Sequence, residues 1–350
     1  MTKKRYNFLD ILRIIAFAMI IFYHMVIQLA LDGFCSLDAI SPFYSNANIQ
    51  FANIGVTLFF MISGAGLMLS SRENFNLKDY YKKRFLKILV PFYLVYIVYL
   101  IYLKISCDFN AVFVPGIPLW RIIFTVLGMD EYIYASTGLL TFSIGIGEWF
   151  LGCIILMYLL FPLVRKCMLK NKHLTLLLAT IIYIFTVVTY NSDIPSTINF
   201  ILKFYEFILG MYLILTIEKL PKWSQGILLP IIILYICWPT TFPIFLSFSI
   251  AILGVTLFLF FRNLEDIFTR TPKLIHVIKT CCSYSFEVYL IHHVIIRKFS
   301  AILSPRIVTI WGVLFLFFLE IVAMLIGSII VKKMVALIIG FNYKKLFIRK

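Results

Sequence analysis

The segment that most constrains the fold is the apolar run at residues 8–30, FLDILRIIAFAMIIFYHMVIQLA, which contains Arg13 and His24. It is long enough to cross a bilayer as a helix, which takes about 20 apolar residues. A helix places these two residues on nearly the same face, about 16 Å apart along its axis. Because a charged side chain at membrane depth costs about 3 kcal/mol, both are candidates for a functional site. The alternatives are an Arg that reaches the nearby headgroups and a His that bonds a neighbouring helix.

The composition indicates an integral membrane protein. Of the 350 residues, 62% are hydrophobic and 14% are charged, which is more apolar surface than a soluble domain can bury. The net charge of +16 does not indicate nucleic acid, because the basic residues lie in short runs between apolar segments and suit anionic lipid headgroups. The first apolar run is too long for a signal-peptide core, so we expect it to be retained as a span.

Apolar runs of about 15 to 25 residues between polar breaks predict ten membrane spans. They cover residues 8–30, 51–71, 86–104, 144–164, 174–190, 198–217, 226–239, 243–261, 281–298 and 307–331. The seventh and eighth could form one broken hairpin, because Pro239 and Pro243 crowd their connection. Residues 119–128 are too short to cross and are expected at the interface, as an amphipathic or re-entrant piece. Since no repeat or linker divides the chain, we expect one integral membrane domain over residues 1–350.

The positions of Lys and Arg predict the orientation of these spans. Basic groups lie at the N-terminus, after each even-numbered span and at the C-terminus, whereas residues 31–50, 191–197 and 240–242 contain no Lys or Arg. Lys298 and Arg306, beside Arg297, are the exception. The sequence therefore predicts an all-α polytopic membrane helix bundle with about ten transmembrane helices and both termini in the cytoplasm.

The same counting places His24 and Glu148 at a similar depth in the outer half of the membrane. A His within reach of a carboxylate in a dry site can act as a general base, while the acid stabilises the imidazolium that forms. The structural alternative is a His and a Glu that merely join two helices. Glu206 lies at a similar depth, but Lys203 three positions earlier favours an intrahelical ion pair instead.

A cationic segment, KDYYKKRFLKILVP, covers residues 78–91 on the predicted cytoplasmic side. Arg84 and Lys87 share a helix face and suit a phosphorylated ligand, with Arg supplying bidentate contacts and Lys a point charge. The alternative is an ordinary basic juxtamembrane helix. Because the chain has no HExxH, P-loop, GxGxxG or CxxC motif, we expect neither a metal site nor nucleotide hydrolysis. Ser63, in FFMISGAG, is typical of small residues that let helices approach closely.

Several of these patterns together resemble the acyltransferase family 3 membrane proteins. Arg13 and His24 match that family's R-x10-H signature, and FFMISG at 59–64 is similar to its FFxxSG. RFLKILVPFY at 84–93 resembles its RxxR-x-x-x-P-x-Y element, with Lys87 in place of the second Arg. Three more segments, GEWFL at 147–151, FYEFILGMYL at 204–213 and SYSFEVYLIHH at 283–293, follow in the family's order, so the resemblance covers essentially the whole chain.

The resemblance implies transfer of an acyl group, usually acetyl, from cytoplasmic acyl-CoA to a hydroxyl of a cell-envelope or exported carbohydrate. His24 would be the catalytic base or acyl relay, and Glu148 a carboxylate of the site. Arg13 would contact the CoA donor, whose phosphates Arg84 and Lys87 would bind, although Lys cannot form the bidentate fork. Possible supporting residues are Ser63, Tyr93 and His292.

The partners implied are acyl-CoA as donor substrate, with no bound cofactor, a carbohydrate or glycolipid acceptor, and the lipids of the cell membrane. Two other classes stay open. A multi-pass transporter or exporter of a lipid-linked saccharide fits the scattered intramembrane charges, but the absence of an internal repeat and the paired basic and His elements count against it. A non-catalytic subunit of a polysaccharide synthesis complex is the third.

Overall fold

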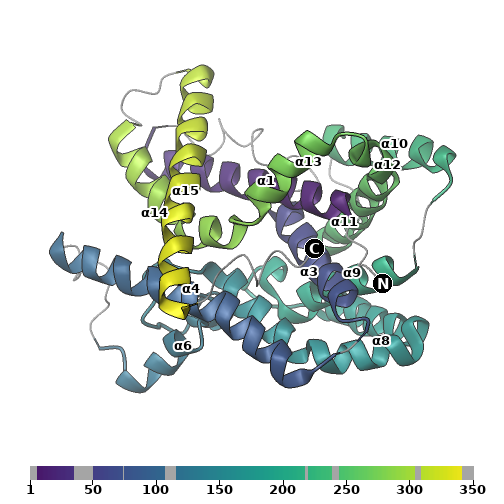
Figure 1. The fold of residues 1–350 in the computed structure, drawn as a ribbon. Helices are drawn as coiled ribbons and strands as arrows, with labels where there is room; N and C mark the ends of the chain where they lie inside the picture. Colours follow the sequence, from purple (N-terminus) through teal and green to yellow (C-terminus); the bar gives the residue numbers. More distant parts are fainter. Residues whose placement is uncertain are drawn as a thin grey trace. The chain divides into compact units, whose positions relative to one another are not determined.

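The computed structural model describes residues 6–34, 50–73, 75–106, 116–216, 220–238, 244–303 and 309–340. Within these ranges the protein is helical and contains no strand (Figure 1). The chain divides into two compact units. Unit 1 comprises Met1–Thr2, Asn76–Leu159 and Ser283–Lys350, and unit 2 comprises Lys3–Phe75 and Leu160–Cys282. The expectation of a single membrane domain stays a prediction.

Unit 2 is organised around a helix that packs against three others. Its helices are α1 (Asn7–Leu31), α3 (Phe51–Ser70), the later part of α8 (Glu148–Thr189), α9 (Phe200–Thr216), α10 (Gln225–Cys237), α11 (Leu246–Asn263), α12 (Glu265–Thr269) and α13 (Pro272–Cys282), with 3-10 turns at Ser196–Ile198 and Lys222–Ser224. Helix α3 contacts α1, α9 and α11. A side chain on Gly64 would collide with the carbonyl oxygen of Phe207, and one on Gly210 with the backbone of Met61. The close helix approach expected of the small residues beside Ser63 is therefore seen at Gly64.

Unit 1 contains the first residues of α8, together with α4 (Leu77–Ile105), α6 (Ile122–Val126), α7 (Asp130–Thr137), α14 (Ser285–Leu303), α15 (Ile310–Ile339) and a 3-10 turn at Leu119–Arg121. Helices α4, α14 and α15 pack against one another. Their buried core comprises Ile88, Phe92, Val95, Tyr96, Tyr99, Leu103, Ile144, Ile146, Leu151 and Leu290. This core surrounds the start of α8, where the candidate site lies.

Local polar contacts set several helix ends. Asn76 accepts a hydrogen bond from the backbone N–H of Asp79 at 2.9 Å and caps α4. The Glu265 carboxylate accepts from the first two N–H groups of α1, those of Asn7 at 2.9 Å and Phe8 at 2.8 Å. A negative charge at a helix N-terminus is favourable, so a residue far along the chain fixes where α1 begins.

Six of the described helices are long and apolar enough to cross a membrane: α1, α3, α4, α8, α11 and residues Trp311–Ile339 of α15. The consecutive helices α13 and α14 raise the number to seven if together they count as one span. The predicted fourth and fifth spans, 144–164 and 174–190, correspond to the two parts of α8 on either side of Asn171, whose backbone is not helical (φ −155°, ψ 93°). Helices α9 and α10, in the predicted sixth and seventh spans, have only 17 and 13 residues. The count of ten and the cytoplasmic termini stay predictions.

Residues 119–128 form only short helical turns, which are too short to cross a membrane, as expected. The connection with Pro239 and Pro243 lies outside the described residues, and so does Arg306.

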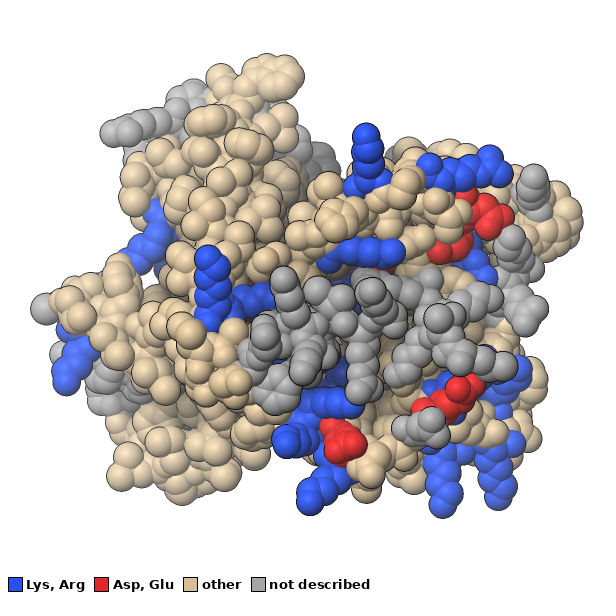
Figure 2. Space-filling view, viewed as in Figure 1, with Lys and Arg blue, Asp and Glu red and all other residues tan. Residues whose placement is uncertain are grey.

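Large apolar side chains cover the outer faces of long helices, for example Phe185 on α8 (69% exposed) and Phe315 on α15 (61%). In Figure 2, Lys and Arg form small groups separated by wide areas without charged residues. Lipid is the solvent that suits such surfaces, which indicates an integral membrane protein.

Candidate active site

Glu148 is the first residue of α8, and its backbone is strained. Its φ is +37°, and within the described ranges no other residue apart from glycine has a positive φ. Gly145 and Gly147 just before it also have positive φ, at +76° and +95°. A left-handed conformation costs a residue with a Cβ about 1–2 kcal/mol and is retained where the surroundings enforce it, commonly at functional sites.

The surroundings of Gly147 explain how this turn is held. A Cβ at Gly147 would lie 2.6 Å from Leu151 Cδ2 and 3.4 Å from Phe92 Cε2. The Tyr289 hydroxyl of α14 donates a hydrogen bond to the Gly147 carbonyl oxygen. Packing from α4 and a hydrogen bond from α14 therefore fix the backbone immediately before Glu148.

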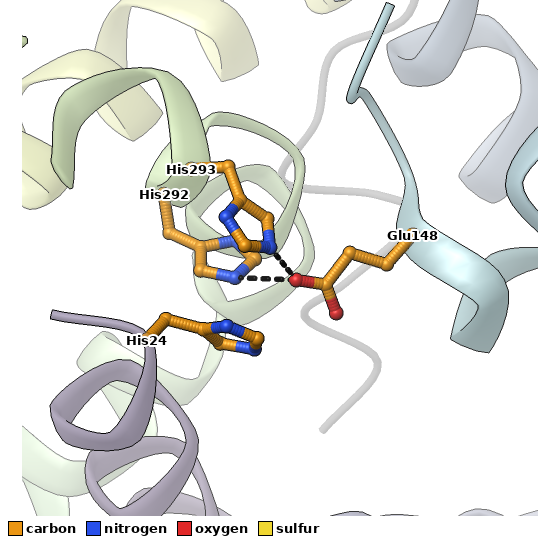
Figure 3. Close-up of side chains that lie close together, drawn as sticks. All are labelled: His24, Glu148, His292 and His293. Atoms are coloured by element: carbon orange, nitrogen blue, oxygen red, sulfur yellow. Dashed lines mark ion pairs between the residues drawn. The ribbon is translucent and has the colours of Figure 1, made fainter. Parts of the chain in front are cut away.

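Two adjacent histidines of α14 meet the Glu148 carboxylate (Figure 3). His292 Nε2 lies 3.3 Å from Glu148 Oε1, and His293 Nε2 contacts the same oxygen. The two imidazole rings are 4.4 Å apart between centroids and tilted by 38°. The His292 side chain is 2% exposed, whereas those of Glu148 and His293 are 16% and 28% exposed. One carboxylate oxygen thus serves two imidazoles, one buried and one partly open.

A backbone contact fixes the tautomer of His292. Its Nδ1 lies 2.5 Å from the carbonyl oxygen of Tyr289. A carbonyl oxygen can only accept, so Nδ1 carries the proton. In the neutral imidazole, Nε2 then presents its lone pair toward Glu148. Tyr289 therefore orients the His292 ring through its backbone and the Glu148 segment through its hydroxyl.

Helix α7, outside the helices long enough to cross a membrane, adds two acidic residues. Burial raises the pKa of Glu131, hydrogen bonding from Ser143 lowers it, and the charge of Glu148 raises it further. Arg297 acts on Glu131 in the opposite sense to Glu148. Glu131 and Arg297 therefore belong to the electrostatic surroundings of Glu148 within unit 1.

The neighbouring Asp130 is buried more fully. Burial raises its pKa to about 6, although hydrogen bonds involving Thr125 and Thr141 favour the charged form. The Thr141 hydroxyl also donates to the Asp130 carbonyl oxygen at 3.1 Å. The hydrogen bond from Thr141 thus joins the segment that leads to Glu148 to the first residue of α7.

His24 lies on α1 in unit 2, half-buried, with its ring edge-to-face with Tyr23 at 5.2 Å. Glu148 belongs to unit 1, and its neighbours there are His292 and His293. The pairing of His24 with Glu148 therefore stays a prediction. Ser63, on α3, is half-buried in unit 2.

Arg13 forms an ion pair with Asp10, one turn earlier on α1, at 2.9 Å between Nη1 and Oδ1. The Arg13 side chain is 27% exposed and that of Asp10 is 6% exposed. Cys282 Sγ donates to the Asp10 backbone oxygen at 3.2 Å. Sequence reasoning missed this pair, although the D-x-x-R spacing places both residues on one helix face. The donor contact proposed for Arg13 stays a prediction.

Arg84 lies on α4, half-buried, with its guanidinium 5.3 Å from the ring centroid of Tyr158 and 5.8 Å from that of Tyr80. Its Nε is buried without a hydrogen-bond partner. Stacking on aromatic rings holds the guanidinium while leaving donors for an anion. This geometry suits an anion-binding group.

Lys87, one turn further along α4, has three positively charged side chains near it. Arg84, Lys83 and Lys332 all act on it electrostatically. Lys332 comes from α15, and its Nζ donates to the Ser283 carbonyl oxygen at 2.5 Å. The basic cluster is thus larger than the α4 segment alone, because a residue from the other end of the chain joins it.

Tyr93, on the same helix, has a structural contact. Its hydroxyl donates a hydrogen bond to the carbonyl oxygen of Val126, at the end of α6. It therefore joins α4 to the short helical segment of unit 1, and a supporting role in the site stays a prediction.

The predicted ion pair of α9 is confirmed. Lys203 Nζ lies 2.8 Å from Glu206 Oε1 and 3.4 Å from Thr57 Oγ1 of α3, and both charged side chains are 3% exposed. Glu206 is thereby neutralised on its own helix.

Four contributors to the site around Glu148 were missed as such by sequence reasoning: His293, Tyr289, Glu131 and Arg297. The one local signal concerned Glu148 itself: the G-x-G-E sequence at 145–148, since paired glycines directly before a carboxylate indicate an unusual backbone. The four missed residues lie on other helices, α7 and α14.

Comparison with known proteins identifies the family. No curated protein and no solved structure matches the chain. The family model described as an acyltransferase domain matches residues 6–333, nearly the whole chain. With its apolar helices and its matching motifs, the chain belongs to acyltransferase family 3, a family of membrane acyltransferases.

Proposed function

We propose that this protein transfers an acyl group, in the first instance acetyl, from acyl-CoA to a hydroxyl of a cell-envelope or exported carbohydrate, within the cell membrane. The observation that carries the proposal is the family match over residues 6–333. The donor, the acetyl group and the acceptor, a carbohydrate or glycolipid, are parts of the proposal.

In the proposed reaction, His24 accepts the proton of the acceptor hydroxyl as its oxygen attacks the thioester carbonyl. The C–S bond then breaks, and the CoA thiolate leaves and takes up a proton. Alternatively, His24 carries the acyl group between the two substrates. Glu148 serves as the carboxylate of the site, supported by His292.

Donor binding is assigned to the basic cluster of α4. Arg84, held by two aromatic rings, supplies directed N–H donors, and Lys87 adds charge beside Lys332. Arg13 is proposed to contact the donor as well, in competition with its ion pair to Asp10. Ser63 and Tyr93 are proposed as supporting residues.

The test of catalysis is His24→Ala in protein purified into lipid nanodiscs, with radiolabelled acetyl-CoA and candidate polysaccharides. Loss of a general base lowers the rate about 10²–10⁴-fold, so we expect transfer to fall by that factor while expression stays normal. The matched control is His173→Ala, a histidine of α8 in the same unit whose ring contacts Tyr212. Normal transfer by His24→Ala protein would end the assignment.

The test of donor binding is Arg84→Ala against Arg270→Ala, an exposed arginine after α12. Loss of one charged contact of about 1.4 kcal/mol raises the KM for acetyl-CoA about tenfold, with a smaller change for the acceptor. An unchanged KM for acetyl-CoA in the Arg84 variant would contradict the assignment.

A further inference from the structure

We propose that Glu148, His292 and His293 form a metal site that binds one Zn²⁺ ion. The three side chains belong to unit 1 and supply a carboxylate oxygen and two imidazole nitrogens that converge (Figure 3). Two His and one Glu are a common zinc ligand set in which a fourth position stays open for water or substrate. The site shares Glu148 with the proposed active site, but ion binding and acyl transfer are measured separately.

The separation of His292 from Glu148 agrees with coordination of a common ion. Zinc bonds to nitrogen and oxygen are about 2.0–2.1 Å long, so two ligand atoms of a tetrahedral site lie about 3.3 Å apart. His292 Nε2 and Glu148 Oε1 are 3.3 Å apart. His293 Nε2 contacts the same oxygen, so the third ligand atom lies within reach of the same ion.

The tautomer of His292 requires a positive charge between it and Glu148. Because Nδ1 donates to Tyr289, a neutral His292 directs an unprotonated Nε2 at the carboxylate. Two acceptors facing each other in a buried position repel each other, and either a proton or a metal ion removes the repulsion. The hydrogen bond from Nδ1 to a backbone carbonyl is also the contact that metal-ligating histidines usually make.

A divalent ion would serve all three groups at once, through the lone pairs of both Nε2 atoms and an oxygen of the carboxylate. The two imidazole rings lie 4.4 Å apart between centroids, so both can reach one ion beside Glu148. The partial exposure of Glu148 and His293 gives the ion access, and the strained backbone of Glu148 holds its carboxylate toward the rings.

No motif in the sequence indicated this site. The ligands come from the start of α8 and the middle of α14, and adjacent histidines on a helix usually diverge by about 100°. Folding brings them together, and a spacing rule does not detect such sites.

The test is the metal content of the protein purified without a polyhistidine tag, by inductively coupled plasma mass spectrometry and by titration of chelator-treated protein with ZnCl₂. We expect one Zn²⁺ per chain for the unmodified protein and for His173→Ala and His276→Ala, which remove histidines of unit 2. His292→Ala, His293→Ala and Glu148→Gln should each weaken binding about 100-fold or more.

A second measurement needs no variant. X-ray absorption at the zinc edge of the unmodified protein should show two imidazole ligands and oxygen at about 2.0–2.1 Å. Absence of stoichiometric zinc after titration, a spectrum without imidazole, or unchanged affinity in the His293 variant would overturn the site. Protein that transfers acetyl but binds no zinc on titration overturns the metal site alone, whereas zinc-loaded protein that transfers nothing overturns the proposed function alone.

Discussion

Two buried polar clusters in this protein differ in how they are built. Lys203 and Glu206 lie three apart on α9, both 3% exposed, and form an ion pair at 2.8 Å that Thr57 supports. Glu148 instead meets His292 and His293 from another helix, at a backbone conformation that costs free energy. The first cluster neutralises itself locally, and the second depends on tertiary structure.

The difference separates a structural pair from a reactive one. A closed ion pair whose partners sit on one helix balances its own charge. A strained, partly exposed carboxylate that meets two imidazoles is typical of functional sites. Variants of both clusters can therefore test whether this distinction holds.

The largest expected effect is that of Glu148→Gln on acyl transfer. Gln keeps the shape and removes the negative charge, so transfer should fall about 10²–10⁴-fold, with a melting temperature close to that of the unmodified protein. Initial rates with labelled acetyl-CoA measure the change. Glu206→Gln, the matched change in the structural pair, should lower stability instead. If the Glu148 variant transfers acetyl at a rate within threefold of the unmodified protein, the distinction between a structural and a reactive cluster fails.

The next effect is that of Glu206→Leu on stability. Removing one partner leaves Lys203 buried and unpaired, which costs about 3–5 kcal/mol in free energy of unfolding. The double variant Lys203→Met with Glu206→Leu should regain most of that loss. Unfolding by SDS in mixed micelles measures both. Equal stabilities of the single and double variants would show that the pair is not coupled.

A smaller effect is expected for Gly147→Ala. The positive φ of +95° and the added Cβ at 2.6 Å from Leu151 both oppose alanine, at a cost of about 1–3 kcal/mol. Transfer should fall as Glu148 shifts. Gly66→Ala is the control, because a Cβ there meets nothing within 4 Å and alanine favours a helix. A Gly147 variant as stable as the Gly66 variant would mean that the turn before Glu148 is not constrained.

The smallest effect is the pH dependence contributed by Asp130. Its pKa of about 6 is above the ordinary value of 3.8, so the folded protein binds this proton more tightly than the unfolded chain. The charged form therefore lowers stability above pH 6, and the loss is relieved as pH falls from about 6 toward 4. Asp130→Asn should stabilise the protein by about 1 kcal/mol at pH 8 and by less at pH 5. Melting curves at both pH values measure it, and an equal shift at each would exclude titration of Asp130.

The features predictable from sequence were those set by local chemistry. Apolar runs located the helices, a spacing of three gave the pair Lys203 and Glu206, and small residues marked the approach at Gly64. Ordered motifs also indicated the family, which the family match confirmed. Each depends on residues close together in the chain, where helix geometry alone fixes neighbours.

The features that sequence reasoning missed depend on distant segments. His293 reaches Glu148 from a helix 145 positions away, and Lys332 joins the cluster at Lys87 from α15. Only packing determines such contacts. The break between the predicted spans at 144–164 and 174–190 was instead a local feature, because the polar stretch between them contains Asn171, whose backbone is not helical and whose side chain accepts from the Leu174 N–H at 3.0 Å.

The two bonds of Tyr289 have a consequence for which sequence changes the site can accommodate. Its backbone holds the ring of His292 and its hydroxyl holds Gly147, so Tyr289 and His292, three positions apart on one helix turn, align both halves of the site. Substitutions on the opposite side of α14 leave this alignment intact. An inserted or deleted residue between Tyr289 and His292 would rotate one half by about 100° relative to the other, so this turn can vary in composition but not in length.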